Sequence, residues 1–327
     1  MTGFGAPAPA PAKSQSPSDV DGPRFTPCPT NRLLLVLHVA VAMVQFFVLP
    51  LFLLPLDIAW ALILLPLALF NNPLWSLIHE TVHGTFDSHP VQNRAAGRVL
   101  AVCYGAPWRI LRTGHLLHHR FNRSPLERPE IYNPGETRWP IAAGKYYFQL
   151  FVGLYLTQIL SPIAFFLPLR TMRWARRRFV APDSYNGYAA TTLLRPRCVR
   201  EVRIDGAAIL AVLCLSAFAY GAHLWMLGLV LLTRGVCISF LDYIYHYASR
   251  TDDTASAYNL SLPAAAQKML LNFNLHAIHH RHPQAPWHQL PALFENNGDR
   301  FSGTYVHFAL RQMRGPVPRT YRDASWT

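Results

Sequence analysis

The chain has 327 residues, of which 51% are hydrophobic and only 14% are charged, whereas about 25% of residues in an average soluble domain are charged. So few charges cannot coat the surface of a water-exposed globule of this size. We therefore expect lipid to cover part of the surface. The net charge of +13 accompanies long apolar runs, which favours an anionic membrane surface or an acidic protein partner over nucleic acid. The five cysteines are scattered without a C-x-x-C pair, so we expect neither a disulfide framework nor a cysteine metal site.

The N-terminal part of the chain predicts a tail followed by a helical hairpin. Residues 1–31 are rich in Pro, Ala and Ser without hydrophobic periodicity, so we expect a disordered tail. The apolar runs Leu33–Leu54 and Ile58–Ile78 follow, separated by a short Pro-Leu-Asp turn. A bilayer core takes about 20 helical residues, so each run is long enough to cross. Together they predict a transmembrane hairpin.

Three more apolar segments follow a polar stretch over residues 79–144. They are Tyr146–Leu169, Gly206–Ala222 and Leu224–Tyr247, and an arginine-rich linker with nine arginines (170–203) lies between the first two. Loops rich in Lys and Arg stay on the cytoplasmic side of a membrane. If all five apolar segments of the chain crossed, this linker would lie outside, and the last histidine cluster would lie on the opposite face from the others.

The simplest solution is that 146–169 enters the membrane and returns without crossing, with its turn at Ser161-Pro162. A single long tilted helix over 206–247 is the alternative, against which the arginine-rich linker argues. We therefore expect an all-α integral membrane bundle of about four spans plus a re-entrant segment. Both termini and a helical cap that holds the metal site would face the cytoplasm. The membrane domain would cover 32–310, followed by a C-terminal tail over 311–327.

Nine of the fifteen histidines stand at spacings that suit metal coordination. His79 and His83 end the second apolar run four residues apart, so they share a helix face. The pattern H-x-x-H-H then occurs twice, at His115, His118 and His119 and at His276, His279 and His280, while His246 ends the last apolar run. The isolated histidines are interpreted as surface or interface residues: His38, His89, His223, His282, His288 and His307.

This number of imidazoles implies two metal ions. Neutral imidazole binds Fe, Zn, Cu and Ni, and eight or nine nitrogens exceed the four ligands that a single zinc takes. The second N–H of a ligand ring needs an outer acceptor, and Glu80 and Asp242 are the acidic residues best placed to provide it. Two redox-active ions could activate O2 for attack on a C–H bond, which no side chain does unaided.

The three histidine clusters on this hairpin plan resemble the membrane fatty acid desaturase and hydroxylase superfamily over roughly residues 33–300. The resemblance includes Asn272 four residues before His276, and His279-His280-Arg281-His282-Pro283 followed by Pro286-Trp287 and Leu290-Pro291. It implies a helical membrane bundle whose cytoplasmic cap holds two iron ions. It also implies eight ligands, completed by His246 and a water held by Asn272: His79, His83, His115, His118, His119, His276, His279 and His280.

Two other functions fit part of the pattern. His79-Glu80-Thr81-Val82-His83 also spells the H-E-x-x-H signature of zinc metalloproteases, in which Glu80 would activate water. That hypothesis leaves at least five clustered histidines unexplained. Metal transport would place ionisable residues along the spans, whereas these clusters lie at helix ends. Within the oxidoreductase interpretation, desaturation and hydroxylation of an apolar, acyl-type substrate both remain open, because they share the first C–H cleavage.

The electrons for O2 chemistry must come from a separate protein. The sequence has no C-x-x-C ladder, no H-P-G-G haem signature and no G-x-G-x-x-G nucleotide motif. We therefore expect an external donor such as ferredoxin or rubredoxin with its reductase. Such carriers are commonly acidic, and the arginines that flank the second cluster are candidates for docking one: Arg109, Arg112, Arg120 and Arg123. Those over 170–178 are interpreted as anchors near anionic lipid headgroups.

Overall fold

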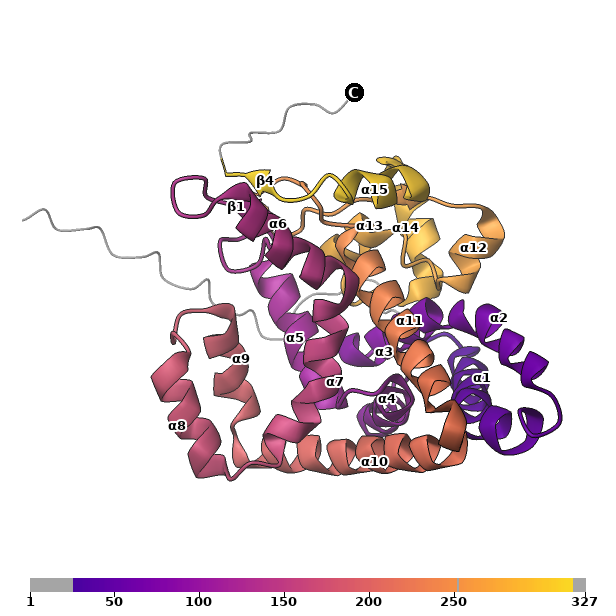
Figure 1. Ribbon diagram of the computed structural model, residues 1–327. Helices are drawn as coiled ribbons and strands as arrows, with labels where there is room; N and C mark the ends of the chain where they lie inside the picture. The colour runs from indigo at the N-terminus through magenta and orange to yellow at the C-terminus, as the bar shows by residue number, and fades with distance from the viewer. Residues whose placement is uncertain (1–25, 252, 320–327) are drawn as a thin grey trace, which may run out of the picture.

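The computed structural model describes residues 26–251 and 253–319. The fold is mostly helical, as predicted, with helices packed around each other and a group of short helices at one end (Figure 1). Within those residues, the β-strands form two short parallel pairs. Strand β1 (Ile131–Tyr132) pairs with β4 (Val317–Pro318), and β2 (Leu260–Ser261) pairs with β3 (Gly303–Thr304).

The first predicted hairpin is present. Helix α1 (Asn31–Met43) continues into the wider helix η1 (Val44–Leu53), which contains Pro50. A proline lacks the N–H that an α-helix would use, which favours a widened turn at this point. The second arm of the hairpin is helical as well and consists of η2 (Ile58–Ile63), α2 (Leu64–Ala68) and α3 (Asn71–His83). At the turn, the Asp57 side chain accepts the Ala59 N–H.

Helices α4 (Pro90–Tyr104) and α5 (Trp108–Phe121) follow, and then a long helical segment made of α6 (Trp139–Phe148), η3 (Gln149–Gly153) and α7 (Leu154–Phe165). The expected turn at Ser161-Pro162 is wrong, because α7 runs through both residues. Pro162 cannot donate to the carbonyl of Gln158, four residues earlier, but the Ser161 hydroxyl donates to that carbonyl instead. Side chains that satisfy freed carbonyls in this way allow proline inside a helix.

The next helices connect this segment to the region of His246. They are α8 (Leu169–Phe179), α9 (Tyr185–Leu193), α10 (Pro196–Tyr220), η4 (Gly221–His223) and α11 (Leu224–Tyr243). Helical residues run without a gap from α10 to α11, but Gly221 has φ 49° and ψ −117°. Only glycine adopts such angles without strain. The chain bends there, and α10 and α11 leave the bend in different directions (Figure 1).

The C-terminal third forms the group of short helices: α12 (Ala264–Met269), α13 (His276–Arg281), η5 (Trp287–Gln289), α14 (Leu290–Asn296) and α15 (Tyr305–Gln312). Both expected domain boundaries lie inside structured elements. Asn31 is the first residue of α1 and is buried, and Arg311 is a buried residue of α15. Most of the expected N-terminal tail (1–25) and the end of the C-terminal one (320–327) lie outside the described residues.

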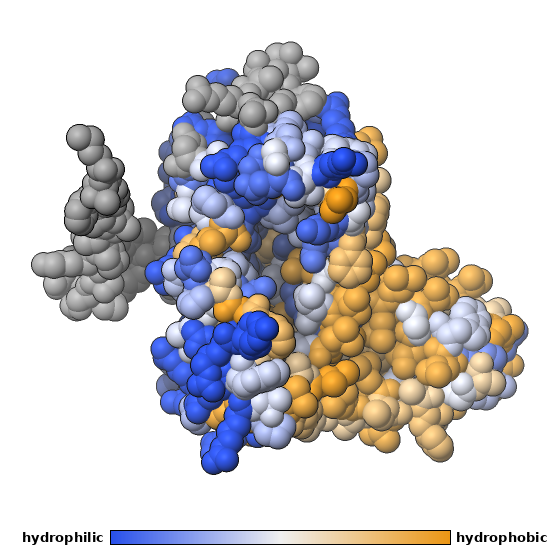
Figure 2. Space-filling view, turned by 60° about the vertical axis from the view of Figure 1, so that its left-hand side comes forward, coloured by the Kyte–Doolittle hydropathy of each residue, from blue (hydrophilic) through white to orange (hydrophobic). Residues whose placement is uncertain are grey.

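Three described helical segments are long and apolar enough to cross a membrane: Asn31–Leu53, Trp139–Phe165 and Pro196–Tyr243. The bent pair Ile58–Ala68 and Asn71–His83 makes a fourth if it counts as one span. Large apolar side chains such as Phe52, Trp60 and Phe218 are exposed on these segments. Figure 2 shows hydrophobic surface gathered on one side of the molecule and hydrophilic surface over the rest of that view. This distribution suits a protein partly embedded in lipid.

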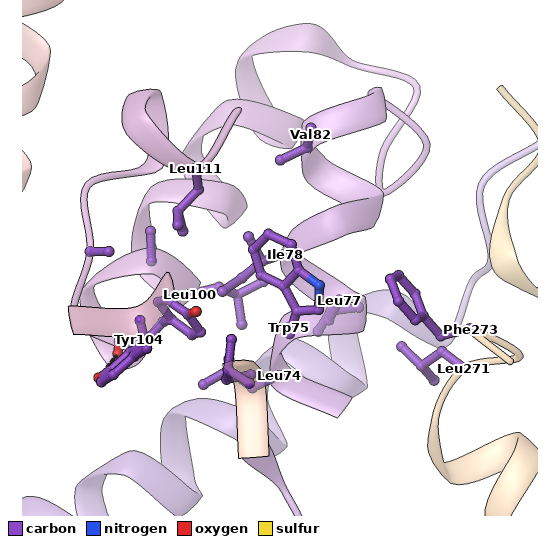
Figure 3. Packing of buried hydrophobic residues seen from close by; sticks show 14 of the residues in the cluster. Leu74, Trp75, Leu77, Ile78, Val82, Leu100, Tyr104, Leu111, Leu271 and Phe273 are labelled. Carbon is purple, nitrogen blue, oxygen red and sulfur yellow. Dashed lines mark hydrogen bonds between the residues drawn. The ribbon is translucent and has the colours of Figure 1, made fainter. Parts of the chain in front are cut away.

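Two apolar clusters hold the helices in place. One joins η1 to the junction between α10 and α11. There Phe46 and Leu49 of η1 pack with Tyr220 of α10 and Met226 of α11. The other surrounds α3, as Figure 3 shows: Leu100, Tyr104 and Leu111 lie on one side of that helix, and Leu271 and Phe273 lie on the other. The second cluster fixes the helix that carries the first two histidine ligands.

Arg234, in the middle of α11, is a structural residue that the sequence analysis did not identify. Its side chain is 2% exposed, and its guanidinium donates to the side-chain oxygens of Gln45 and Asn71 and to the carbonyl oxygens of Cys103 and Tyr104. A buried arginine needs such acceptors, because an unpaired charge in an apolar interior is costly. It thereby ties η1, α3 and α4 to α11.

Candidate metal centre

The nine clustered histidines come together in two neighbouring groups. The five-histidine group consists of His79, His83, His115, His119 and His279, and the four-histidine group consists of His118, His246, His276 and His280. Within each group, the candidate ligand atoms all lie within 4.8 Å of one another. The groups adjoin, since the rings of His119 and His280 stack with their centroids 4.3 Å apart.

The repeated H-x-x-H-H pattern explains how two helices serve both groups. In α5, His115 and His119 are four residues apart and point to the five-histidine group, while His118 points to the other. In α13 the division is reversed. His276 and His280 serve the four-histidine group and His279 serves the first. Residues i and i+4 share a helix face, and an adjacent residue is rotated by about 100°, so each box supplies both groups.

The remaining ligands come from elements on either side of these two helices. Helix α3 presents His79 and His83 on one face, and its left-handed C-cap, Gly84 (φ 83°), ends the helix directly after them. His246 lies three residues beyond the end of α11, where the backbone N–H of His246 donates to the carbonyl of Tyr243. Segments that are far apart in the sequence therefore come together only in the folded chain.

The ring nitrogens are arranged as a metal would require. In the four-histidine group, the Nε2 atom of His276 lies 3.1 Å from the Nε2 atom of His246 and 3.2 Å from the Nε2 atom of His280. In the five-histidine group, the Nε2 atom of His279 lies 3.0 Å from that of His79 and 2.9 Å from that of His119. Several lone pairs converging on one point repel each other unless a cation lies between them. The donor set therefore fits a metal ion in each group.

Two rings have outer acceptors that fix their orientation. The Nδ1 atom of His118 lies 2.6 Å from Oε1 of Glu127, and the Nδ1 atom of His246 lies 3.3 Å from the carbonyl oxygen of Ser256. With the proton on Nδ1, the Nε2 lone pair of each ring is directed into the group. Sequence reasoning missed Glu127, because it stands in a loop at no helical spacing from a ligand.

The three residues proposed as outer-shell partners have other contacts. The Glu80 carboxylate accepts from the Thr85 hydroxyl and from the Trp287 backbone N–H, and the Asn272 amide donates to the Trp287 carbonyl. Both therefore hold the loop after α13 rather than a ligand ring. The outer acceptor of the His246 ring is the Ser256 carbonyl. Asp242 instead lines a cavity together with His118.

Burial keeps the imidazoles neutral, which is the form that binds metal. Burial, together with the neighbouring His83 and His118, lowers the pKa of His119 to about 2. The same two causes, burial and surrounding histidines, hold the pKa values of His115, His279 and His280 well below their usual range. Burial acts in the same direction on His118, but the charge and hydrogen bond of Glu127 outweigh it and raise that pKa.

The isolated histidines stay outside both groups. His38 is buried in α1 with Nδ1 2.8 Å from the Leu34 carbonyl, and His89 precedes α4 at the surface. The H-E-x-x-H hypothesis also fails on contacts, since Glu80 is held by Thr85 and Trp287, and three further histidines complete the group around its pair. A zinc protease would need a carboxylate free to activate water.

A cavity of about 270 Å³ borders the metal centre between α5, α7, α9 and α11. Trp75, Leu111, Leu154 and Ile238 contribute apolar walls, and His115 and His118 form the end next to the ligands. Binding sites for apolar ligands are typically lined in this way, with a few polar groups. Here those polar groups include Gln158, Tyr185 and Asp242.

Comparison with known proteins places the chain in a family. A comparison with curated protein sequences found no match. The sequence model of fatty acid desaturases matches residues 58–311, which contain all nine clustered histidines, the apolar cavity and the helices that position them. The resemblance inferred from the histidine boxes is therefore confirmed. The chain belongs to the fatty acid desaturase family, and it is a membrane oxidoreductase that acts on acyl chains.

Proposed function

We propose that this protein uses two iron ions and O2 to desaturate or hydroxylate an apolar acyl chain. The observation that supports this most strongly is the division of nine histidines into groups of five and four. Two sites of neutral nitrogen ligands suit a pair of redox-active ions. Iron bound at both groups would supply the O2 chemistry that side chains lack.

The protein residues would position the ions and the substrate. Glu127 holds the His118 ring through Nδ1, so the basicity and direction of that ligand depend on it. The acyl chain would lie in the 270 Å³ cavity, with the reacting carbon at the end formed by His115 and His118. Its apolar walls exclude water from that end of the chain.

We infer that an external donor, such as ferredoxin or rubredoxin with its reductase, supplies the electrons. The docking patch expected from four arginines is, however, not a single surface. Arg123 is buried in an ion pair with Glu130, and the Arg120 guanidinium packs over the rings of Phe121 and Tyr188. Arg109 and Arg112 instead line a cavity next to His83. A docking site is therefore not assigned to these four residues.

Metal analysis of single-histidine variants tests the proposal. The purified protein is expected to hold two irons per chain and to consume O2 in the presence of a reductant and an acyl substrate. His279→Ala and His276→Ala each remove a ligand from a different group, so each should lose iron and turnover while the protein remains inserted in the membrane. His89→Ala, outside both groups, is the control and should behave like the unchanged protein.

Other outcomes would contradict specific parts. One ion of zinc per chain, with peptide hydrolysis that depends on Glu80, would replace the oxidoreductase by the protease. Full turnover in His279→Ala would remove the five-histidine group from the metal site. Mass analysis of lipids from expressing cells then distinguishes the two reactions, since desaturation removes two hydrogens and hydroxylation adds one oxygen.

A further inference from the structure

A second cavity borders the metal centre on the other side of α5. It has a volume of about 310 Å³ and lies between α3, α4, α5 and the start of α10. We call it the arginine cavity, and the residues that define it here are His83, Arg94, Trp108, Arg109, Arg112 and Arg197. Neither the metal site nor the apolar cavity explains why four arginines should gather beside a metal ligand.

The charges in the arginine cavity are not balanced by the protein. Arg109 and Arg197 share a single carboxylate, that of Glu201. Over the described ranges 26–251 and 253–319, no ion pair joins Arg94 or Arg112 to a carboxylate. Asp87 also lines the cavity, but it pairs with Arg32. Positive charge therefore exceeds negative charge in the cavity.

Two of the four arginines, Arg109 and Arg112, pack against the protein, whereas Arg94 and Arg197 are exposed at the mouth of the cavity. The guanidiniums of Arg109 and Arg112 lie over the Trp108 ring, 5.5 and 5.8 Å from its centroid. Arg112 is half-buried, and burial together with the charges of Arg109 and Arg94 lowers its pKa. Keeping like charges close together costs free energy, and a bound anion would offset that cost.

One helix end adds to the positive potential. Helix α10 begins at Pro196, so Arg197 stands in its first turn. The N-terminal end of a helix carries a partial positive charge and unpaired N–H groups. At the start of α5, in contrast, the Asp205 carboxylate accepts from the Trp108 backbone N–H, so the contribution comes from α10.

We propose that the arginine cavity binds a carboxylate or a phosphate group. The planar guanidinium matches both groups in geometry, and a concave site suits a small anion better than the convex face of a protein partner. The anion is either the charged end of a substrate or a separate phosphate-bearing molecule. Binding there does not depend on the reaction proposed above, so the two can fail independently.

Calorimetric titration of the iron-loaded protein with inorganic phosphate, in zwitterionic nanodiscs at low salt, tests this site. We expect one phosphate per chain. The double variant Arg94→Gln/Arg112→Gln should bind about tenfold more weakly or worse, since it removes charge-assisted hydrogen bonds to the anion. Arg170→Gln/Arg173→Gln in α8 removes the same charge from exposed positions outside the cavity and should leave phosphate binding unchanged.

Competition with amphiphiles then identifies the source of the anion. Displacement of phosphate by myristate but not by methyl myristate would assign the site to the charged end of a substrate. Displacement by neither would assign it to a separate phosphate-bearing molecule.

The proposal is wrong if the unchanged protein shows no saturable phosphate binding, or if both double variants lose binding equally, which would reveal a general charge effect. Phosphate bound directly by iron would not respond to the arginine changes, and that result would also overturn it. Binding of an acidic ferredoxin that needs Arg94 and Arg112, without any phosphate binding, would make the surface a protein-docking site instead.

Discussion

At the scale of single residues, the histidine groups follow from local spacing, but the orientation of a ring depends on residues outside the motifs. Glu127 illustrates this, because its carboxylate, in the loop after α5, lies 2.6 Å from Nδ1 of His118. Glu80, next to His79 in the sequence, accepts from Thr85 and Trp287 instead, and Asp242 lines the apolar cavity beside His118. An outer acceptor is selected by its position in space, and sequence separation is a poor guide to it.

Glu127→Gln should weaken iron binding while the fold is retained. Glutamine can still accept from the His118 ring, but it lacks the negative charge that favours the Nδ1 proton. Changes to outer-shell partners typically lower metal affinity by roughly 10–100-fold, and we expect a loss in that range, measured by competition with an iron chelator. Glu136→Gln is the matched control, since Glu136 is exposed and contacts Asn133. Equal iron retention in the two variants would refute a role for Glu127.

At the scale of elements, the site depends on how closely α4 approaches α3 and α5. A Cβ atom at Gly97 in α4 would lie 2.3 Å from Nε1 of Trp108 and 2.6 Å from Oγ1 of Thr81. These two atoms form a buried hydrogen bond with each other. Glycine at this position therefore permits α4 to pack against α3 and α5, the helices that carry five of the clustered histidines.

Gly97→Ala should lower the thermal stability of the protein. Overpacking a well-filled interior typically costs about 1–3 kcal/mol, and the unfolding midpoint measured in detergent should fall by several degrees. Gly228→Ala in α11 is the matched control, because no atom lies within 4 Å of its added Cβ. Alanine is the better helix former, so the control should be as stable as the unchanged protein or more so. A midpoint for Gly97→Ala equal to that of the control would contradict the packing argument.

At the scale of the whole molecule, two hydrogen bonds bear on whether the segment Trp139–Phe165 crosses the membrane. The segment Trp139–Phe165 is 27 residues long and apolar enough to cross, but the chain near its start and the chain after α8 both contact elements on the side of the histidine groups. Near its start, the Tyr146 hydroxyl donates to the carbonyl of Gln312 in α15. Beyond its end, the Tyr185 hydroxyl in α9 donates to the carbonyl of Gly114 in α5. We therefore propose that it does not cross, and that four spans come from α1–η1, η2–α3, α10 and α11.

Labelling of single cysteines in intact cells tests this topology. With the five native cysteines replaced, Asp183→Cys before α9 and Thr254→Cys after α11 should react with an impermeant reagent only after permeabilisation. Both positions are exposed, and the positive-inside rule places the arginine-rich linker in the cytoplasm. Asp57→Cys, in the turn of the first hairpin, should react from outside and serves as the control. Labelling of position 183 but not of position 254 would mean that Trp139–Phe165 crosses.

The proposed metal ions would also stabilise the whole molecule. The clustered histidines come from α3, α5, α13 and the segment after α11, so each ion would link elements that are distant in the sequence. A ligand that binds only the folded state stabilises it. Removing iron with a chelator should lower the unfolding midpoint, and adding iron back should restore it. An unchanged midpoint would mean that the histidine groups are held by packing alone.

The sequence by itself determined the class of the protein, its helical nature and its family. Those features depend on composition and on short-range spacing: apolar runs long enough to span, and histidines at i and i+4, which any helix brings together. Only the tertiary structure decided how the two H-x-x-H-H boxes divide between the groups and which acceptor orients His118. It also decided that helix continues through Pro162 and that four arginines share a cavity. The division of the boxes and the arginine cavity depend on contacts between residues tens to hundreds of positions apart. Glu127 and Ser161 are close in sequence to the groups they serve, but no regular spacing marks them in advance.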